Sequence, residues 1–184
     1  MSPKTHGKIS AAQRFFNNTK LEIFEHALEE PRTDDLQEIV KQKVLAAYEL
    51  VHKPCFAHDS GFFIDALNGF PKSFVRFTLD TLGIEGILKL MNGIPNRKCC
   101  FKECLAYFDG IKINYFDGIQ EGTLSEEILG VNKEEKWSDL WYIFKPYGYD
   151  ITLAEMDEYT RDHREINEHF CPAIRLFADW FESN

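Results

Sequence analysis

The stretch that decides the fold is FAHDSGFFIDALNGFP, residues 56–71. Apolar residues lead into it, the polar Asp59-Ser60-Gly61 interrupts them, apolar residues resume, and Asn68-Gly69-Phe70-Pro71 supplies the residues of a tight connection. A carboxylate at the end of a strand, beside a glycine that admits a close neighbour, is a candidate metal or catalytic position. A β-turn in which Asp59 hydrogen-bonds its own backbone is the alternative.

Composition favours one enzyme-sized domain spanning residues 1–184, because 44% of the residues are hydrophobic and can bury a substantial core. The net charge of -9 and the pI near 5.2 argue against a broad nucleic-acid surface, so any phosphate site is local. No apolar run is long enough to span a membrane, and the first ten residues lack the core of a secretory signal. Five cysteines without a framework spacing suit a reducing compartment. We therefore expect a cytoplasmic protein with no nucleic-acid or membrane partner.

Three of the cysteines lie close together, at Cys99, Cys100 and Cys104. On a strand, Cys100 and Cys104 share one face and Cys99 takes the other, so joint ligation of a metal would need distortion. The pattern favours small packing residues over a metal site.

The prediction for the N-terminal part of the chain starts from one polar turn. Lys8 to Phe16 is poorly patterned for a first strand, whereas Asn17-Asn18-Thr19-Lys20 predicts a turn that opens a helix with an apolar stripe at Leu21, Phe24, Ala27 and Leu28. Backbone donors, Asn side chains and a lysine at a helix start are what a phosphate needs. An ordinary helix cap with a solvated lysine is the alternative.

A second helix is predicted after a cap at Thr33, Asp34 or Asp35, with a stripe that runs from Leu36 to Val51. Its polar face carries Glu38 and Lys43, which ordinarily would be a solvated surface.

The rest of the chain supplies scaffold. Phe74 to Leu90 predicts a helix, a break at Gly83 and a second helix that ends near Gly93. Strands near 100–107 and 111–116 are joined by Asp109-Gly110, a hairpin signal, and Pro172 opens a closing helix with a stripe at Ile174, Phe177 and Phe181.

The 56–71 stretch, together with FKPYGY at 144–149 and AEM at 154–156, resembles the signature of the inosine triphosphate pyrophosphatase family. The resemblance runs from Asn17 to Phe181. It implies an α/β fold with an elongated mixed β-sheet flanked by helices, in two lobes around a central cleft.

The resemblance also implies a site. Glu38 and Asp59 would hold magnesium, with Asp59 also orienting or deprotonating the attacking water, and Lys20 would join Asp59 as a catalytic group by neutralising phosphate charge. Phosphate contacts are expected from Asn17, Lys20, Lys43 and Ser60. Lys72 and Arg76 either touch phosphate or extend into solvent.

Base-reading positions depart from the family pattern. Trp141 falls in a segment that has lost its glycines, and it either stacks on a base or packs into the core. Arg164 and His169 are expected to contact the base, but Phe170 stands where the family has an arginine. Loss of that donor predicts a changed or relaxed base preference; the alternative is that Arg164 or Arg161 restores the contact.

The function implied is a magnesium-dependent nucleoside triphosphate pyrophosphatase, in a homodimer, that yields the monophosphate and pyrophosphate. A non-catalytic nucleotide-binding relative is the competing hypothesis, since Phe15 replaces a family threonine and His58 replaces an acidic residue.

Overall fold

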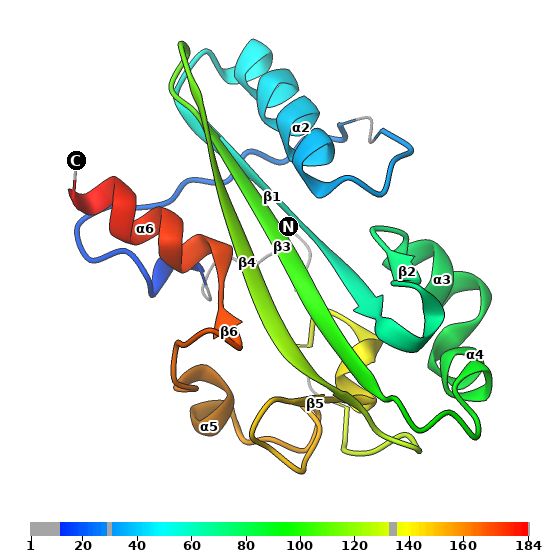
Figure 1. Cartoon of the computed structure of the whole chain (residues 1–184). Helices are drawn as coiled ribbons and strands as arrows, with labels where there is room; N and C mark the ends of the chain where they lie inside the picture. The colour runs from blue at the N-terminus through cyan, green and yellow to red at the C-terminus, as the bar shows by residue number, and fades with distance from the viewer. Residues whose placement is uncertain (1–11, 29–30, 133–135, 184) are drawn as a thin grey trace.

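The computed structural model describes residues 12–28, 31–132 and 136–183. Three long strands form the centre of the molecule: β1 (Cys55–Ile64), β3 (Lys98–Phe108) and β4 (Ile113–Leu124). Short strands extend this sheet at its edges, namely β2 (Pro71–Lys72), β5 (Phe144–Pro146) and β6 (Phe170–Cys171). The strand order is β2-β1-β3-β4-β5, and β6 pairs with β4 beside β5 (Figure 1).

An elongated sheet flanked by helices was predicted, and this architecture is confirmed. Every pairing between the described strands is antiparallel, so this part of the sheet is not mixed. The predicted hairpin is present as β3 and β4, and Asp109 closes its turn by accepting hydrogen bonds from the backbone of Ile111 and Lys112.

The sequence analysis expected the polar Asp59-Ser60-Gly61 to end a strand. These residues lie inside β1 instead. These residues pair with Cys104, Glu103 and Lys102 of β3, so they belong to the antiparallel ladder. Gly61 is needed there because a Cβ atom would lie 2.7 Å from the carbonyl oxygen of Lys72. The turn comes later, at Asn68 and Gly69, which both have positive φ.

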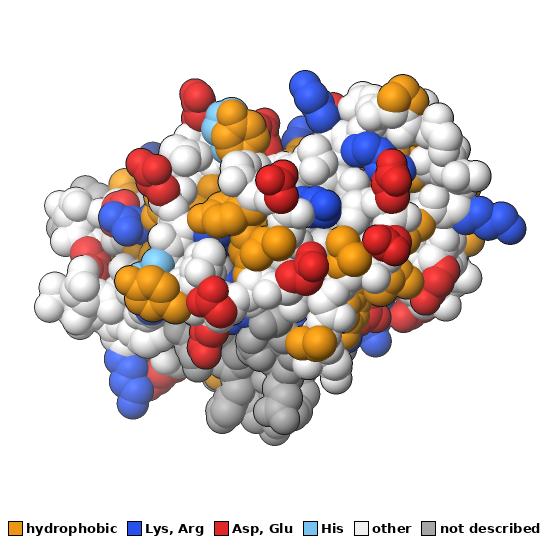
Figure 2. Space-filling model, turned by 90° about the horizontal axis from the view of Figure 1, so that it is seen from below, with side chains coloured by type: hydrophobic (Ala, Val, Ile, Leu, Met, Phe, Trp, Pro, Cys, Tyr) orange, Lys and Arg blue, Asp and Glu red, His pale blue; other side chains and the backbone are white. Residues whose placement is uncertain are grey.

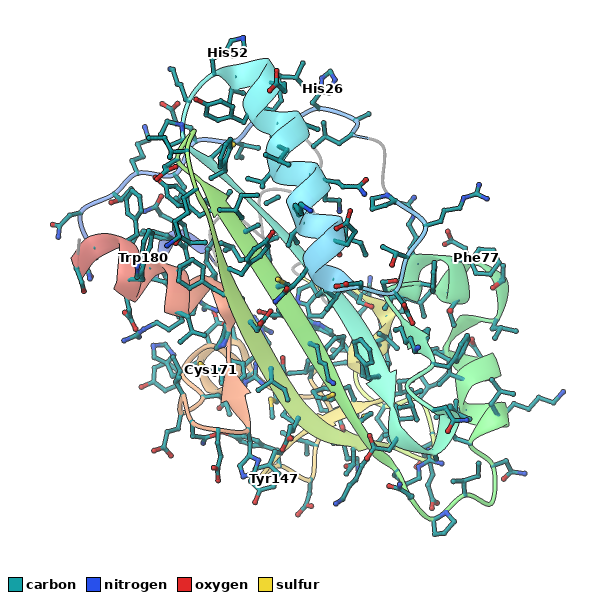
Figure 3. The ribbon with its side chains drawn as sticks, turned by 45° about the horizontal axis from the view of Figure 1, so that its top comes forward. His26, His52, Phe77, Tyr147, Cys171 and Trp180 are labelled. Atoms are coloured by element: carbon teal, nitrogen blue, oxygen red, sulfur yellow. The ribbon has the colours of Figure 1, made fainter. Side chains whose placement is uncertain are left out.

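Two helices cover opposite faces of the sheet. Helix α2 (Leu36–Val51) begins at the N-cap Asp35 and packs Val40 and Val44 on the face that carries Cys104 and Ala106. Helix α6 (Ala173–Ser183) packs Phe177 against the alternate side chains of the same strand, Leu105 and Tyr107. We call these the α2 face and the α6 face (Figure 3).

The remaining elements lie at the ends of the long strands. The predicted break at Gly83 is confirmed: it separates helix α3 (Val75–Thr81) from helix α4 (Gly83–Leu90), and the φ of Gly83 is 67°. Two 3-10 turns, η1 (Asp65–Leu67) and η2 (Asp139–Tyr142), and the short helix α5 (Glu158–Asp162) complete the chain. The largest core cluster lies here, between β1, β3, α4 and η2.

The predicted helix after Asn17 is wrong, because residues 19–28 form no regular secondary structure. The Gln13 side chain binds both the carbonyl of Thr19 and the amide of Leu21, so these backbone groups are used outside a helix. Of the segment Lys8 to Phe16, residues 8–11 lie outside the described part, and Ala12 and Gln13 are helical.

Candidate functional site

A row of polar side chains crosses the α2 face. Asp59 of β1 lies opposite Cys104 of β3, which lies opposite Asp117 of β4, and cross-strand partners project to the same face. The first turn of α2 lies over this row, since the Gln37 amide is 3.4 Å from a carboxylate oxygen of Asp117. The sheet therefore presents two carboxylates beneath a helix start.

Asp59 is held by two contacts. Its Oδ2 forms an ion pair with Nζ of Lys43 from α2, and its Oδ1 accepts a hydrogen bond of 2.7 Å from the backbone amide of Ser60. The side chains of Lys43 and Asp59 are 16% and 23% exposed, so both are accessible from solvent yet partly shielded. The predicted phosphate lysine and the predicted metal carboxylate are thus brought together.

Glu38 lies one turn nearer the start of α2. It accepts a hydrogen bond of 2.7 Å from Gln42 and lies 3.7 Å from the ammonium of Lys41, with 41% of its side chain exposed. Its own backbone amide is bound by the N-cap carboxylate of Asp35.

Burial and nearby carboxylates act together on the pKa of the Cys104 thiol. Burial, and then the nearby carboxylates of Asp117, Asp35 and Asp59, raise it to about 12, so the thiol stays protonated. Asp117 was not singled out from the sequence, and Asp35 was predicted only as a helix cap. The Asp109-Gly110 hairpin could have indicated Asp117. Counting residues outward from the turn along both strands places Asp117 opposite Cys104.

Lys72 and Arg76 differ in position. Lys72 forms an ion pair with Asp34, just before α2, and this pair lowers the pKa of the Asp34 carboxyl, first by hydrogen bonding and then by charge. The neighbouring Ser73 hydroxyl donates to the carbonyl of Thr33, so the β2 loop is tied to the start of α2. Arg76 is 95% exposed and lies 3.7 Å from Asp80. The structure connects Lys72 with the site and leaves Arg76 in solvent.

Asn17 is held on the α6 side of the sheet, away from Asp59. The backbone and side-chain amides of Asn17 both bind the carboxylate of Glu182 at the end of α6, on the opposite face of the sheet. Lys20 is exposed in the irregular segment that follows. The donors expected to hold phosphate are used by a carboxylate of the chain itself.

A second group of polar residues surrounds a pocket of about 350 Å³ where β5 and β6 diverge along β4. His169 lies there, with its Nδ1 2.6 Å from the carboxylate of Glu121 and its ring stacked on Tyr147 at 3.6 Å between centroids. Arg164 also lines the pocket, with its guanidinium over the ring of Phe170. This end of the molecule is seen in Figure 2, where hydrophobic side chains lie among acidic and basic ones, and Figure 3 labels Tyr147.

Trp141 does not line this pocket. It is 4% exposed in the main core, with Arg161 over its ring, so the structure supports the packing alternative and offers no free ring face to a base.

The side chains near the start of α2 include hard oxygen donors of the kind that magnesium prefers. Within the described residues no three His, Cys, Asp or Glu side chains converge closely enough to hold a metal by themselves. Magnesium does not require that, because it is commonly bound by one or two carboxylates together with substrate phosphates and water. Glu38 and Asp59 are such a pair of hard oxygen donors, at the start of α2 and beneath it.

The fold is that of a known class of proteins. The chain superposes on a Ham1 protein from Coxiella burnetii with a TM-score of 0.81, at 20% identity, over 96% of this chain and 94% of that one. A Ham1 protein from Staphylococcus aureus gives a TM-score of 0.78 at 22% identity, with the same coverage.

The sequence comparisons place the chain within that class. A model described as the Ham1 family matches residues 4–180, and the chain belongs to this family. It is 33% identical to a dITP/XTP pyrophosphatase from Thermococcus kodakarensis, over 97% of this chain and 94% of the relative. A protein of the same name from Saccharolobus solfataricus is 35% identical, over 90% and 83% of the two chains. The resemblance identified from the sequence is confirmed.

Proposed function

We propose that this protein is a nucleoside triphosphate pyrophosphatase that cleaves at the α-phosphorus to give the nucleoside monophosphate and pyrophosphate. Its substrate is a purine nucleotide of the non-canonical type, such as inosine or xanthosine triphosphate. The names of the curated relatives, dITP/XTP pyrophosphatase, support this reaction class. Magnesium is the proposed cofactor, held by Glu38 and Asp59, and it would supply positive charge for the phosphates when bound.

The observation that carries the proposal is the Lys43–Asp59 ion pair on the α2 face. A lysine whose counter-ion is a carboxylate is ready to bind a polyanion, because a phosphate oxygen can take the place of the carboxylate oxygen. Asp59 would then be free to orient a water or accept its proton, and Lys43 would stabilise charge that develops on the leaving pyrophosphate. Lys72, whose partner Asp34 is also an acid, is suited to a second phosphate contact.

The two polar regions are spaced as one nucleotide requires. Asp59 is level with Cys104 and Glu121 is level with Cys100, on the same face and two strands away. Four residues along a strand and two strand spacings across give about 17 Å between their Cα atoms. The side chains shorten this gap to a span comparable with an extended nucleoside triphosphate, so phosphates at Asp59 and a base near His169 can belong to one molecule.

Pyrophosphate release tests the proposal. The protein is incubated with inosine, xanthosine, guanosine, adenosine and pyrimidine triphosphates in magnesium, with an EDTA control for each. We expect release from at least one purine triphosphate and none in EDTA. Binding by calorimetry without release from any substrate would favour the non-catalytic alternative, which the replacement of an acidic neighbour by His58 motivates.

Three further parts complete the proposal: the homodimer rests on the family resemblance, and the location and the single unit rest on composition and cysteine usage. We place the protein in the cytoplasm as a homodimer, with residues 1–184 acting as one unit, and sedimentation velocity tests the dimer. In the described part of the chain, no helix combines the length and apolarity needed to cross a membrane.

A further inference from the structure

The lysines around the candidate site differ in their partners. Lys43 and Lys72 are paired with carboxylates, whereas the ammonium of Lys102 on β3 lies over the ring of Phe63, 4.9 Å from the ring centroid. Among residues 12–28, 31–132 and 136–183, no carboxylate forms an ion pair with Lys102. The Lys102 side chain is exposed, and an ammonium over a ring is held only weakly in such a place. Lys102 is therefore a cation that an incoming anion can bind without displacing a carboxylate.

Lys102 lies midway between the two polar regions of the site. Along β3 it is two residues from Cys104, which is level with Asp59, and two residues from Cys100, which is level with Glu121 (Figure 1). Side chains two residues apart on a strand share a face, so all of these project to the α2 face. Two residues along and one strand across put the Cα of Lys102 about 8 Å from those of Asp59 and Glu121, half of the separation between the two. A ligand extended from Asp59 to Glu121 passes over Lys102.

The neighbours of Lys102 on the sheet offer its ammonium no acceptor. It is level with Gly61 of β1 and Ile119 of β4, and neither side carries a polar side chain. The ring of Phe63 lies against Gly61, because a Cβ atom on that glycine would be 2.8 Å from the ring. One ammonium therefore lies between apolar groups on an otherwise open stretch of the face, and an acceptor there has to come from a ligand.

We propose that Lys102 binds the α-phosphoryl group of the nucleotide, which is the group that water attacks. This rests on the proposed function and adds a residue to its site. With the outer phosphates at Lys43 and the base near His169, the α-phosphate and the ribose lie between them. Of these two groups only the phosphate is an anion, and a lysine ammonium is a compact charge suited to it.

The proposed contact fits the bond changes of the reaction. The water oxygen bonds to the α-phosphorus, and its proton passes to Asp59. The bond from that phosphorus to the bridging oxygen breaks, and the oxygen leaves with the electron pair as part of pyrophosphate. Lys102 transfers no proton. It neutralises the non-bridging oxygens of the α-phosphate throughout, so it contacts the substrate, the transition state and the monophosphate product.

The test separates the two products as inhibitors. Lys102→Met removes the charge and keeps an unbranched side chain against Phe63, and Lys102→Arg restores a cation. The matched control is Lys98→Met, an exposed lysine four residues away on the same strand and face, beyond the level of Glu121. Thermal melts establish that each variant is folded. Release of pyrophosphate from inosine triphosphate is then measured against added inosine monophosphate and, with a monophosphate readout, against added pyrophosphate.

We expect Lys102→Met to lower kcat/KM by about 100-fold and to raise the inhibition constant of inosine monophosphate by about tenfold or more. The inhibition constant of pyrophosphate should change by less than about twofold, since that product lies farther from Lys102 and salt screens the difference. Lys102→Arg should recover part of both losses, and Lys98→Met should behave as the wild type. An unchanged inhibition constant for the monophosphate would overturn the inference and leave Lys102 as a packing residue on Phe63. An equal rise for both products would also overturn it.

Failure of the proposed function gives a different result. If the wild type releases no pyrophosphate from any triphosphate, binding of inosine monophosphate and of inosine is measured by calorimetry in the same proteins. Weaker binding of the monophosphate to Lys102→Met, with unchanged binding of the nucleoside, would support the phosphate contact without turnover. Equal changes for the two ligands, or no binding of the monophosphate to the wild type, would reject it.

Discussion

The two ends of the candidate site satisfy their polar groups in opposite ways. On the α2 face two cations already have carboxylate partners, in the Lys43–Asp59 and Lys72–Asp34 pairs. At the pocket beside β6, Gln120 and Arg164 keep donors that are buried and unpaired. A phosphate bound at the first end would displace an internal anion, whereas an acceptor bound at the second would meet donors that no described group of the protein occupies.

This difference separates affinity from selectivity. Exchange of one anion for another yields little net free energy, because the new ion pair replaces an old one. An acceptor that bonds an unsatisfied donor removes the desolvation penalty of that donor. A base that offers the acceptor therefore binds with more favourable free energy than a base that does not. We expect substitutions at the charged end to reduce the rate for all substrates, and substitutions at the other end to change the ratio between substrates.

The largest effect is expected from the carboxylates. Asp59→Asn and Glu38→Gln should each lower kcat for pyrophosphate release by about 10³-fold or more, because each removes charge from one proposed magnesium site. The double variant should be little worse than either single one, since both disable the same site. Steady-state kinetics over a magnesium titration provide the measurement.

The control for these variants is Asp80→Asn, an exposed carboxylate on α3 beside Arg76. It should retain full activity. Near-normal turnover in either Asp59→Asn or Glu38→Gln would remove that residue from the metal site.

The next effect contrasts two lysines. Lys43→Ala should reduce kcat/KM by about 10² to 10³-fold, the loss typical of one donor to developing charge. The sequence analysis assigned Lys20 a catalytic role, for which a loss of ~2 to 4 kcal/mol would be expected. Lys20 is exposed, and it follows Asn17, whose amides bind Glu182 on the α6 side. On these structural grounds we expect Lys20→Ala to change kcat/KM by less than about threefold. A large loss on Lys20→Ala would show that the N-terminal segment reaches the phosphates after all.

The segment after Asn17 illustrates what the sequence could and could not predict. Segments whose ends are marked by Gly, Pro or a capping Asp were predicted well, such as α2 after Asp35 and the break at Gly83. The segment after Asn17 has a helical apolar stripe, but side chains outside the segment take its backbone and amide groups, as the nearby Gln13 and the distant Glu182 do. Local pattern cannot include such contacts, so tertiary context overrides it.

The candidate site follows the same rule. The Glu38 and Lys43 spacing on one helix was visible in the sequence, and α2 carries Lys43 to Asp59 of β1. Asp117 and Glu121 were not identified, because their places depend on the register of three strands. One residue of slippage would project both to the other face.

A smaller effect is expected at Glu121, which contacts His169 without being assigned to the base itself. Glu121→Gln keeps the shape and an acceptor but removes the charge that fixes the Nδ1 proton, so His169 should hold its orientation less well. We expect about a tenfold rise in KM with little change in kcat. A fall in kcat at constant KM would instead indicate a role in the chemical step. Glu168→Gln serves as the control, since that carboxylate is 86% exposed and 3.6 Å from the other ring nitrogen.

The smallest effect concerns stability and contrasts the α6 face with the charged end of the site. Glu103 accepts a hydrogen bond of 3.0 Å from the backbone amide of Ala173 at the start of α6 and lies 3.5 Å from His58. Burial would raise its pKa, but the hydrogen bond and charge of His58 and the amide of Ala173 outweigh burial and lower it. A carboxyl with a lowered pKa stabilises the fold at pH values above its unfolded pKa near 4.5, and this stabilisation is lost as the pH falls through the folded pKa.

Glu103→Gln should therefore cost about 1 kcal/mol of unfolding free energy at pH 7 and less at pH 4, by urea titration at both values. Because Glu103 projects to the α6 face and Asp59 to the α2 face, turnover at pH 7 should change by less than about twofold. A stability difference that grows as the pH falls would mean that Glu103 is protonated in the native protein, and that the α6 start is held by a neutral acid.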